Sequence, residues 1–518
     1  MKRLRLRNET RDDSRRHRDT PTPGDDTPAP GDTDHSPADI VLTGGRVHTM
    51  DAAGSVAEAI AIRAGRIARV GGAEEITPLI DRRTRVIRLR GGAVLPGIND
   101  SHLHGVWLGT MWPNLLMDQL AGGDHHGDHH GDHHGDHHGD HHGDHHGGPP
   151  PARLETSADR RRAILRTAEL LASLGITSYT EPGLGPGEDA GPSGCFGSAA
   201  LRDYADLAAE GLLTSRVTAL MLFGELDGPS SLAGLLEGLR TFVPPADVPG
   251  RFRVAGVKIF ADGIPPMGTA WTDEPYGDGT YGGLLIEGDT AERREADLIA
   301  MVDAAHAAGH QIGVHATGSR TTRTVTDALA TALRKNGQII TKHPARHYVI
   351  HGDLLHPSTL AAMAAAGVGL NTQAGIPVAT QDMLTAVLGQ DVLPHAWPLR
   401  DALAAGVPLC LSSDAPVLTP DWRAGVVAAV TRRGLDGRVR GEAQRLTVAQ
   451  ALRAYTITPA WQDGDEAWKG SLEPGKVADL CVLEADPLET EPSALPEVPV
   501  LLTMMDGQIV YENQTNLI

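Results

Sequence analysis

The sequence contains little of what several classes of protein require. It has three cysteines, Cys195, Cys410 and Cys481, which lie far apart and show no Cys-x-x-Cys spacing. A disulfide framework and a zinc ribbon are therefore excluded, and a reducing cytoplasm is the expected location. Aromatic residues make up 4% of the chain, which offers no stacking platform for nucleic-acid bases.

Positive charge and long apolar runs are also scarce. The chain has 46 Lys and Arg against 66 Asp and Glu, a formal net charge of -20. Such a balance repels phosphate backbones and anionic bilayers, so we expect neither nucleic acid nor a membrane as a partner. No apolar run approaches the length of a membrane span. The expected partner is a small molecule, and homo-oligomerisation stays open.

A chain of 518 residues favours one barrel-sized domain with a smaller partner. Residues 1–37 are rich in Arg, Asp, Pro and Thr and are predicted to form a disordered tail. Short β-branched strands broken by glycines follow in 38–92, and the same texture returns in 468–518. These two segments are predicted to build one small β-sandwich domain together.

Residues 93–467 alternate helical and strand-like segments. Helices are expected at 160–174, 199–210 and 293–308, and strands at 175–180, 215–223, 254–260, 311–315, 347–351, 367–371 and 407–414. Alternation of this kind implies parallel pairing, and about eight units suggest a (β/α)8 TIM barrel with chemistry at the carboxyl ends of its strands. The predicted fold class is thus α/β, a TIM barrel with a β-sandwich domain from both chain ends.

One segment has no place in a packed core. Six tandem Gly-Asp-His-His units fill residues 123–146 and hold twelve of the 25 histidines. Glycine at every fourth position and the lack of apolar residues predict a disordered, solvated loop over 123–148. Two interpretations stay open: an arm that gathers metal, since His and Asp are both ligands, or a low-complexity expansion tolerated in a loop.

The chain is organised around Val94-Leu-Pro-Gly-Ile-Asn-Asp-Ser-His-Leu-His-Gly105. Residues two apart in an extended strand point to the same face, so His102 and His104 are predicted to aim both imidazoles at one point. Leu103 would pack behind them. Imidazole is a common zinc ligand, but a catalytic metal needs about three protein ligands, and an isolated pair is more often two histidines in a polar loop.

Four further candidates come where predicted strands end. Lys258 interrupts an apolar run and is either part of a buried ion pair, with Asp262, or a lysine carboxylated by carbon dioxide. His315 and His351 each end an apolar run and, taken singly, are more often core or substrate-binding histidines. Asp414 ends another and could instead cap the next helix. Their joint order, each on its own strand, favours one shared site with the His-x-His pair.

These motifs resemble the amidohydrolase superfamily of metal-dependent hydrolases, and within it the family-3, YtcJ-like amidohydrolases. The resemblance extends from about Asp39 to Tyr511. It rests on Leu95-Pro-Gly-Ile-Asn-Asp-Ser-His-Leu-His104, Val257-Lys-Ile-Phe-Ala-Asp-Gly263, Val314-His-Ala-Thr-Gly318, Ser413-Asp-Ala-Pro416 and Gly470-Ser-Leu-Glu-Pro-Gly-Lys-Val-Ala-Asp-Leu480.

The resemblance implies a divalent metal cofactor, with zinc as the expected ion and one or two ions per chain. Its ligands would be His102, His104 and Asp414 on the more buried ion, His315 and His351 on the other, and carboxylated Lys258 as the bridge. A mononuclear site in which the lysine stays unmodified remains open.

The activity that the resemblance implies is hydrolysis of a non-peptide carbon–nitrogen bond, in an amide, N-acyl or N-formyl compound, by a metal-activated hydroxide. Asp414 would be the catalytic base. Relatives often carry an acidic residue where this chain has Ser319 and an arginine where it has Gly268, so substrate identity is not carried over. A hypothesis from another class is a metal-storing or metal-delivering protein that uses the His-rich repeat.

Overall fold

The computed structural model describes residues 36–118, 153–336, 345–389 and 391–513, and the described residues from Pro37 onward belong to one compact unit. Nearly all of the predicted tail and the whole Gly-Asp-His-His repeat lie outside the described residues. In the described part of the chain, no helix combines the length and apolar character that crossing a bilayer requires.

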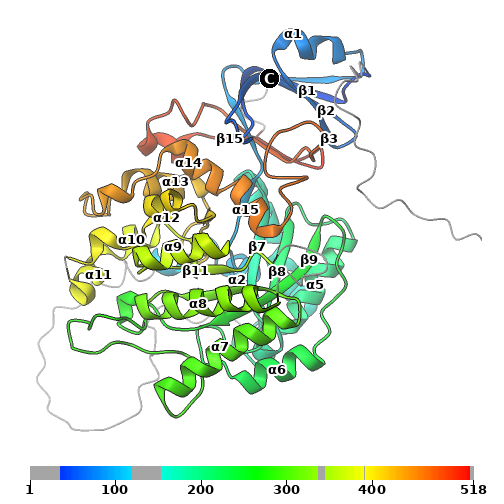
Figure 1. The fold of residues 1–518 in the computed structure, drawn as a ribbon. Coiled ribbons are helices and arrows are strands. Elements are labelled where there is room, and N and C mark those ends of the chain that lie inside the picture. Colours follow the sequence, from blue (N-terminus) through cyan, green and yellow to red (C-terminus); the bar gives the residue numbers. More distant parts are fainter. Residues whose placement is uncertain (1–35, 119–152, 337–344, 390, 514–518) are drawn as a thin grey trace, which may run out of the picture. The chain divides into compact units, whose positions relative to one another are not determined.

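One of the two sheets consists of eight parallel strands, each paired with the next in chain order (Figure 1). They are β6 (Ile98–Asp100), β7 (Ile176–Leu184), β8 (Arg216–Leu222), β9 (Phe252–Phe260), β10 (Gln311–Ala316), β11 (Tyr348–His351), β12 (Gly369–Thr372) and β13 (Leu409–Leu411). Backbone hydrogen bonds after the first and last strands close the ring, from Asp414 N to His102 O at 2.9 Å and from His104 N to Ala415 O at 2.8 Å. The predicted (β/α)8 barrel is confirmed.

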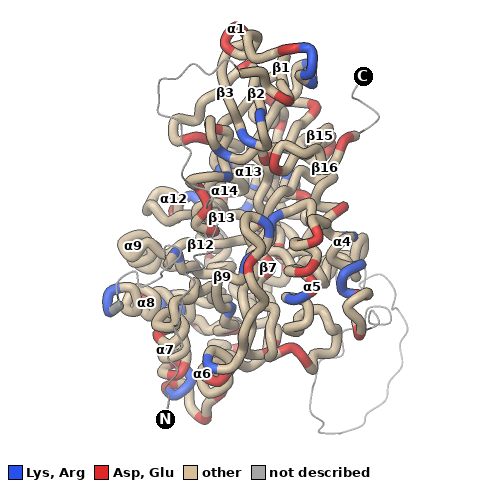
Figure 2. The backbone as a smooth tube through the Cα atoms, turned by 90° about the vertical axis from the view of Figure 1, so that its right-hand side faces the viewer, with Lys and Arg blue, Asp and Glu red and all other residues tan. Residues whose placement is uncertain are grey.

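Helices connect the strands and cover the outside of the barrel (Figure 1). They are α2 (Gly105–Met111), α4 (Ser157–Ser173), α5 (Ser198–Ala209), α6 (Leu232–Thr241), α7 (Ala291–Ala307), α8 (Ser319–Asn336), α9 (Pro357–Ala366), α10 (Ile376–Ala379), α11 (Gln381–Leu388), α12 (Leu399–Ala405), α13 (Trp422–Thr431), α14 (Val448–Ala454) and α15 (Ile457–Asp463). Local sequence sets where they begin: Thr156 and Asp159 form a capping box at α4. Basic and acidic residues lie side by side on outer helices such as α7 and α8 (Figure 2).

The second sheet draws its strands from both chain ends. They are β1 (Ile40–His48), β2 (Val56–Arg63), β3 (Arg66–Gly71), β4 (Arg85–Arg88), β5 (Ala93–Pro96), β14 (Leu480–Leu483), β15 (Val500–Met505) and β16 (Gln508–Glu512), with the short helix α1 (Ala73–Ile76) nearby. Strand β5 pairs antiparallel with β14, which joins the two ends. Because β5 runs directly into β6, this sheet anchors the strand that leads to the His-x-His pair.

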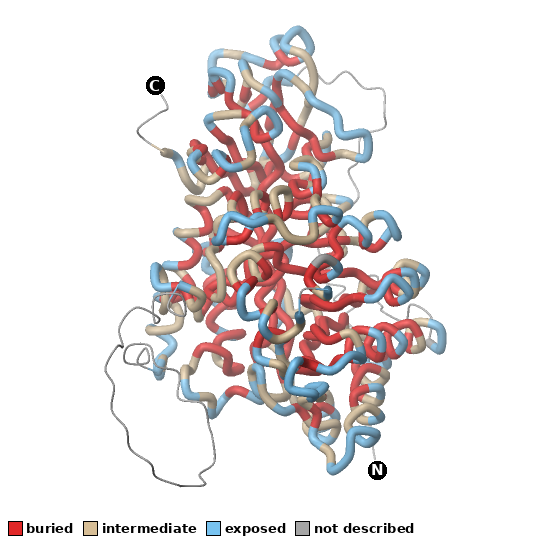
Figure 3. The backbone as a smooth tube through the Cα atoms, turned by 90° about the vertical axis from the view of Figure 1, so that its left-hand side faces the viewer, coloured by how far each residue is buried: buried red, intermediate tan, exposed pale blue. Residues whose placement is uncertain are grey.

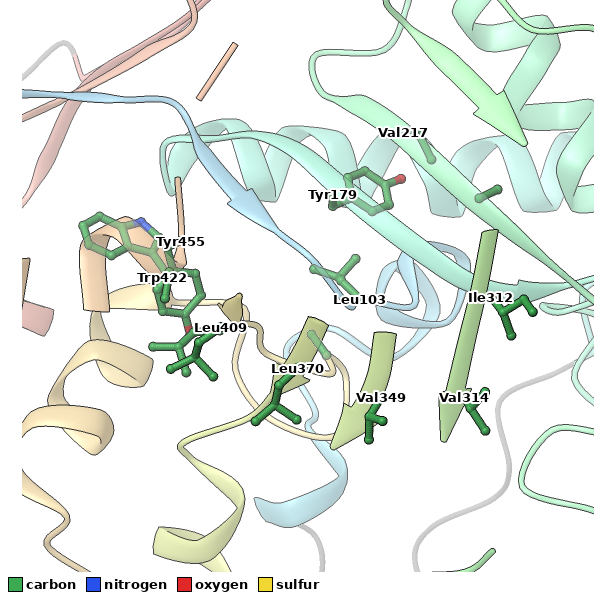
Figure 4. Packing of buried hydrophobic residues seen from close by; sticks show 14 of the residues in the cluster. Leu103, Tyr179, Val217, Ile312, Val314, Val349, Leu370, Leu409, Trp422 and Tyr455 are labelled. Carbon is green, nitrogen blue, oxygen red and sulfur yellow. The ribbon is translucent and has the colours of Figure 1, made fainter. Parts of the chain in front are cut away.

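Apolar side chains of the strands and inner helix faces form the barrel core. Figure 3 shows that the chain segments inside the molecule consist largely of buried residues. Residues of neighbouring strands pack against one another within it, among them Val314, Val349, Leu370 and Leu409 (Figure 4). Leu103 is fully buried in the same cluster, as the sequence predicts. This packing holds the carboxyl ends of the strands rigidly, which is what a site built from several strands requires.

Candidate active site

The His-x-His pair follows its strand instead of lying in it, which corrects the expected extended conformation. Strand β6 ends at Asp100, whose carboxylate accepts hydrogen bonds from the backbone N–H groups of His102 (3.3 Å) and Ser413 (3.1 Å). This contact turns the chain and ties the first strand to the last. The rings of His102 and His104 nevertheless lie 5.3 Å apart, close enough to share one ligand site.

Asp414 completes a group of three with these histidines. Its Oδ1 atom lies 3.1 Å from Nε2 of His102 and 3.5 Å from Nε2 of His104. One potential ligand atom from each of the three buried residues lies within 4.8 Å of the others. The alternative role of Asp414 as a helix cap is wrong, because Asp421 caps α13. The chain thus brings together a His/His/Asp set of the kind that binds divalent metals.

His315 and His351 lie next to this group, at the ends of β10 and β11. Their ring centroids are 4.5 Å apart, and the ring of His351 is 5.2 Å from that of His102. Nε2 of His315 is 3.1 Å from the carbonyl oxygen of Gly263, and Nδ1 of His351 is 2.7 Å from Oε1 of Gln373. Each contact engages one ring nitrogen of its histidine.

Lys258 is buried at the end of β9, and its Nζ atom has no hydrogen-bond partner among the described residues. The alternative of an ion pair with Asp262 is not borne out by the contacts. That carboxylate instead accepts hydrogen bonds from the backbone N–H groups of Trp271 (3.0 Å), Thr317 (3.0 Å) and Gly318 (2.9 Å). Lys258 therefore remains available for another partner in the site.

Comparison with known proteins decides the family. A sequence model of the amidohydrolase family matches residues 137–511, which is well over half of the chain. The chain belongs to the amidohydrolase family. The matched residues include Lys258, His315, His351 and Asp414 and begin after the His-x-His pair, so geometry alone connects that pair with the others.

Similar proteins agree with this assignment. The amidohydrolase is 28% identical to the YtcJ protein of Bacillus subtilis (strain 168), an amidohydrolase by name, over 49% of this chain and 47% of that one. It is 39% identical to the N-substituted formamide deformylase of Arthrobacter pascens, over 22% of this chain and 21% of that one. The matches thus span about half or less of these curated relatives.

A solved structure with the same fold is that of an uncharacterized metal-dependent hydrolase from Pyrococcus horikoshii OT3. It superposes with a TM-score of 0.64 at 19% identity and covers 88% of this chain and 99% of its own. At this identity the likeness concerns the fold. The family favours a hydrolase over the metal-storing hypothesis, whose His-rich repeat lies outside the described residues.

Burial governs the electrostatics of the amidohydrolase site. It lowers the pKa of His102 to about 4 and of His315 to about 3, with the nearby charge of Lys258 acting in the same direction. Burial also lowers the pKa of Lys258 to about 8, against the opposing charge of Asp414. His102 and His315 are therefore neutral imidazoles, the form that binds metal.

The surroundings favour the charged forms of His104 and Asp414: the pKa of His104 is raised and that of Asp414 is lowered. Burial disfavours charge on His104, but Asp414 and Glu181 outweigh it and raise its pKa to about 9. Burial likewise opposes ionisation of Asp414, but the two histidines of the pair outweigh it and hold its pKa well below the usual range. Asp414 thus stays a carboxylate, as a metal ligand must.

The residues present fit a divalent metal. Nδ1 of His102, Nδ1 of His315 and Nζ of Lys258 are buried without hydrogen-bond partners in the described part of the chain. Unpartnered buried polar atoms are costly, and a bound cation would satisfy the two imidazole nitrogens. The assignment of individual ligands to individual ions stays a prediction.

Sequence reasoning missed one residue of this site. Glu181 of β7 is fully buried, and its Oε1 atom lies 3.6 Å from Nδ1 of His104. The available signal was a single acidic residue within the otherwise uncharged strand Ile176–Leu184. A carboxylate at such a position has to meet a partner, and the strand order places it beside β6.

Proposed function

We propose that this protein is a metal-dependent hydrolase that cleaves a non-peptide carbon–nitrogen bond in a small amide, N-acyl or N-formyl compound. One observation carries the proposal: His102, His104 and Asp414 converge within 4.8 Å at the carboxyl ends of the barrel strands. In TIM-barrel enzymes this end of the barrel carries the chemistry.

The bond class is supported by a relative. The N-substituted formamide deformylase of Arthrobacter pascens is named for an N-formyl substrate, and it shares 39% identity with part of this chain. That similarity favours an acyl or formyl group on nitrogen. Ser319, at the start of α8, and Gly268, next to Tyr276, stand at the two positions where relatives often differ, so we leave the acyl group open.

His102, His104 and Asp414 would hold the more buried ion, and His315 and His351 a second one. Lys258, once carboxylated, would bridge them, and zinc is the ion we propose. When bound, a divalent ion would lower the pKa of a water molecule and polarise the carbonyl group of the substrate. With Lys258 unmodified, the same residues would hold a single ion.

The protein itself moves the proton. The side chain of Asp414 is 11% exposed, against 2% for His102, which supports the carboxylate of Asp414 as the group that meets the substrate. It would take a proton from the attacking water and deliver it to the nitrogen of the leaving amine as the carbon–nitrogen bond breaks. His102 and His104 fix Oδ1, which keeps the carboxylate in place during both transfers.

The test is a screen of N-acyl amines, N-formyl amines and cyclic amides with zinc-loaded protein. Amine release that a chelator abolishes and added zinc restores is the expected result. Protein with a measured site-bound metal that hydrolyses esters but no member of these amide classes would contradict the bond class. Absence of chelator-sensitive hydrolysis of any kind would contradict the metal-dependent activity.

A further inference from the structure

Glu181 is a buried carboxylate with one satisfied and one unsatisfied oxygen. Oε2 accepts hydrogen bonds from the backbone N–H of Gly105 at 2.6 Å and from the hydroxyl of Tyr204 at 2.8 Å. Oε1 has no hydrogen-bond partner among the described residues and lies 3.6 Å from Nδ1 of His104, which has none either. Two buried polar atoms that face each other in this way are costly unless they act together.

The ring of His104 lies between two carboxylates. Its Nδ1 atom faces Glu181, and its Nε2 atom is 3.5 Å from Oδ1 of Asp414, to which Nε2 of His102 is also directed. A neutral imidazole has one N–H group and one lone pair. If the proton is on Nδ1, facing Glu181, the lone pair of Nε2 points to the place where the other ligand atoms meet.

We propose that Glu181 is a positioning residue of the metal centre. It accepts the Nδ1 proton of His104 and thereby fixes the tautomer and ring orientation in which Nε2 binds the metal. Carboxylates that orient ligand histidines in this way contribute to metal affinity without touching the ion. The inference rests on the metal site of the proposed function and adds a residue to it.

Neighbouring residues hold the carboxylate of Glu181 in position. The hydroxyl of Tyr179 donates to that of Tyr204 at 3.0 Å, which in turn donates to Oε2. A Cβ atom on Gly105 would lie 2.6 Å from the Tyr204 hydroxyl and 3.2 Å from Oε2. Only glycine therefore lets the chain after the His-x-His pair pass this close to the carboxylate.

The Glu181→Gln variant tests this role, because it replaces one carboxylate oxygen, a hydrogen-bond acceptor, with an NH2 group, a hydrogen-bond donor. The amide oxygen must replace Oε2 to accept from Gly105 and Tyr204, so the NH2 group faces Nδ1 of His104. Nδ1 must then accept, the proton moves to Nε2, and the metal loses a lone pair. We expect zinc affinity about 10-fold to 100-fold weaker than in the parent chain.

The measurement is bound zinc per full-length chain at a series of free zinc concentrations set by a chelator. His102→Asn, measured in the same way, gives the zinc held elsewhere, including by the His-rich repeat, and is subtracted. The unfolding midpoint of the metal-free protein is the second readout. Glu188→Gln is the matched control, because Glu188 is another buried acid whose Oε1 accepts from Leu226 N–H at 2.7 Å, away from the histidines.

The expected pattern is weaker site binding in Glu181→Gln with an unchanged metal-free midpoint, partial recovery in Glu181→Asp, and parent-like values in Glu188→Gln. Affinity within about twofold of the parent in Glu181→Gln would overturn the role. A lower midpoint together with failure of Glu181→Asp would make the residue merely structural, and loss as complete as in His102→Asn would make it a ligand. If the parent itself holds no His102-dependent zinc, the proposed function fails first.

Discussion

Asp414 combines two roles, as a ligand and as a proton carrier, that substitution can separate. Asparagine keeps the shape and one ligand oxygen but accepts no proton, so Asp414→Asn should retain much of the metal. Its rate should fall about 100-fold to 10,000-fold. His102→Asn should reduce the rate mainly by emptying the site. The measurement is kcat beside metal content, and an unaltered rate in a fully loaded Asp414→Asn would contradict the mechanism.

A single substitution at Lys258 tests whether a carboxylated lysine takes part in metal binding. Methionine fills the same space but cannot form a carbamate, so Lys258→Met should lower metal occupancy and activity together. Short carboxylic acids added to the solution should partly restore both by occupying the bridging position. Metal analysis and rate measurements with and without acetate check this. Full occupancy and full rate in Lys258→Met would favour the site in which the lysine stays unmodified.

Residues differ in how readily the sequence reveals them. His102, His104 and Asp414 were found because ligand-type residues stand directly after predicted strands, and the structure brings these three together. Glu181 was missed because its role depends on contacts across 76 residues, with the backbone after the pair. No local pattern encodes that contact, since it exists only once β7 packs beside β6.

Among the helices and strands, α7 and the residue just before β11 contribute a buried histidine pair away from the metal site. Nδ1 of His306 is 2.9 Å from Nε2 of His347, whose Nδ1 accepts a hydrogen bond from the backbone N–H of Ile312 at 3.0 Å. Burial, followed by the neighbouring His306, lowers the pKa of His347 to about 3. Between these two pKa values the imidazole of His347 is neutral in the folded protein, whereas it is protonated in the unfolded chain, where its pKa is about 6.5.

The pair predicts a pH dependence of stability. Between pH of about 6.5 and about 3 the unfolded state binds the extra proton, so the free energy of unfolding should fall by up to about 1.4 kcal/mol per pH unit as pH decreases. His347→Asn keeps an acceptor for Ile312 N–H and should remove this part of the slope. Urea unfolding of the metal-free parent and variant from pH 8 to pH 5 checks it; parallel curves would refute the assignment.

Element boundaries were predictable where local signals mark them. The helix expected at 199–210 is Ser198–Ala209, and the one expected at 293–308 is Ala291–Ala307. The strand expected at 407–414 is Leu409–Leu411, and Asp414, which follows it, has a left-handed conformation with φ of 58°, outside the extended region. The strained backbone conformation occurs at a residue of the candidate site. The amino-acid composition of the strand gives no sign of it.

At the scale of the whole molecule, an ion pair of Arg216 with Asp479 connects the barrel to the second sheet. Its guanidinium lies at the start of β8 and contacts Asp479, just before β14, through two hydrogen bonds of 2.7 and 2.9 Å. Both side chains are buried, 6% and 5% exposed. Arg216→Met would leave a buried carboxylate without its partner, and the free energy of unfolding should fall by about 3–5 kcal/mol.

The control for this prediction is Arg240→Met, which breaks an exposed pair with Glu237 and should cost about 1 kcal/mol or less. Urea unfolding of the three proteins measures the differences. The double variant Arg216→Met/Asp479→Leu should recover much of the loss, because it removes the unpaired charge. Equal stability of Arg216→Met and the parent would show that the contact does not join the two sheets energetically.

The central claim is that the strand-end residues bind metal by themselves, independently of the Gly-Asp-His-His repeat. Deleting residues 123–146 removes twelve histidines that are candidate ligands of another kind. The deciding measurement is metal per chain in this deletion protein after dialysis against a weak chelator, alone and with His102→Asn. We predict that one or two ions remain in the deletion protein and are lost with His102→Asn. Loss of nearly all metal on deletion of the repeat would contradict the account.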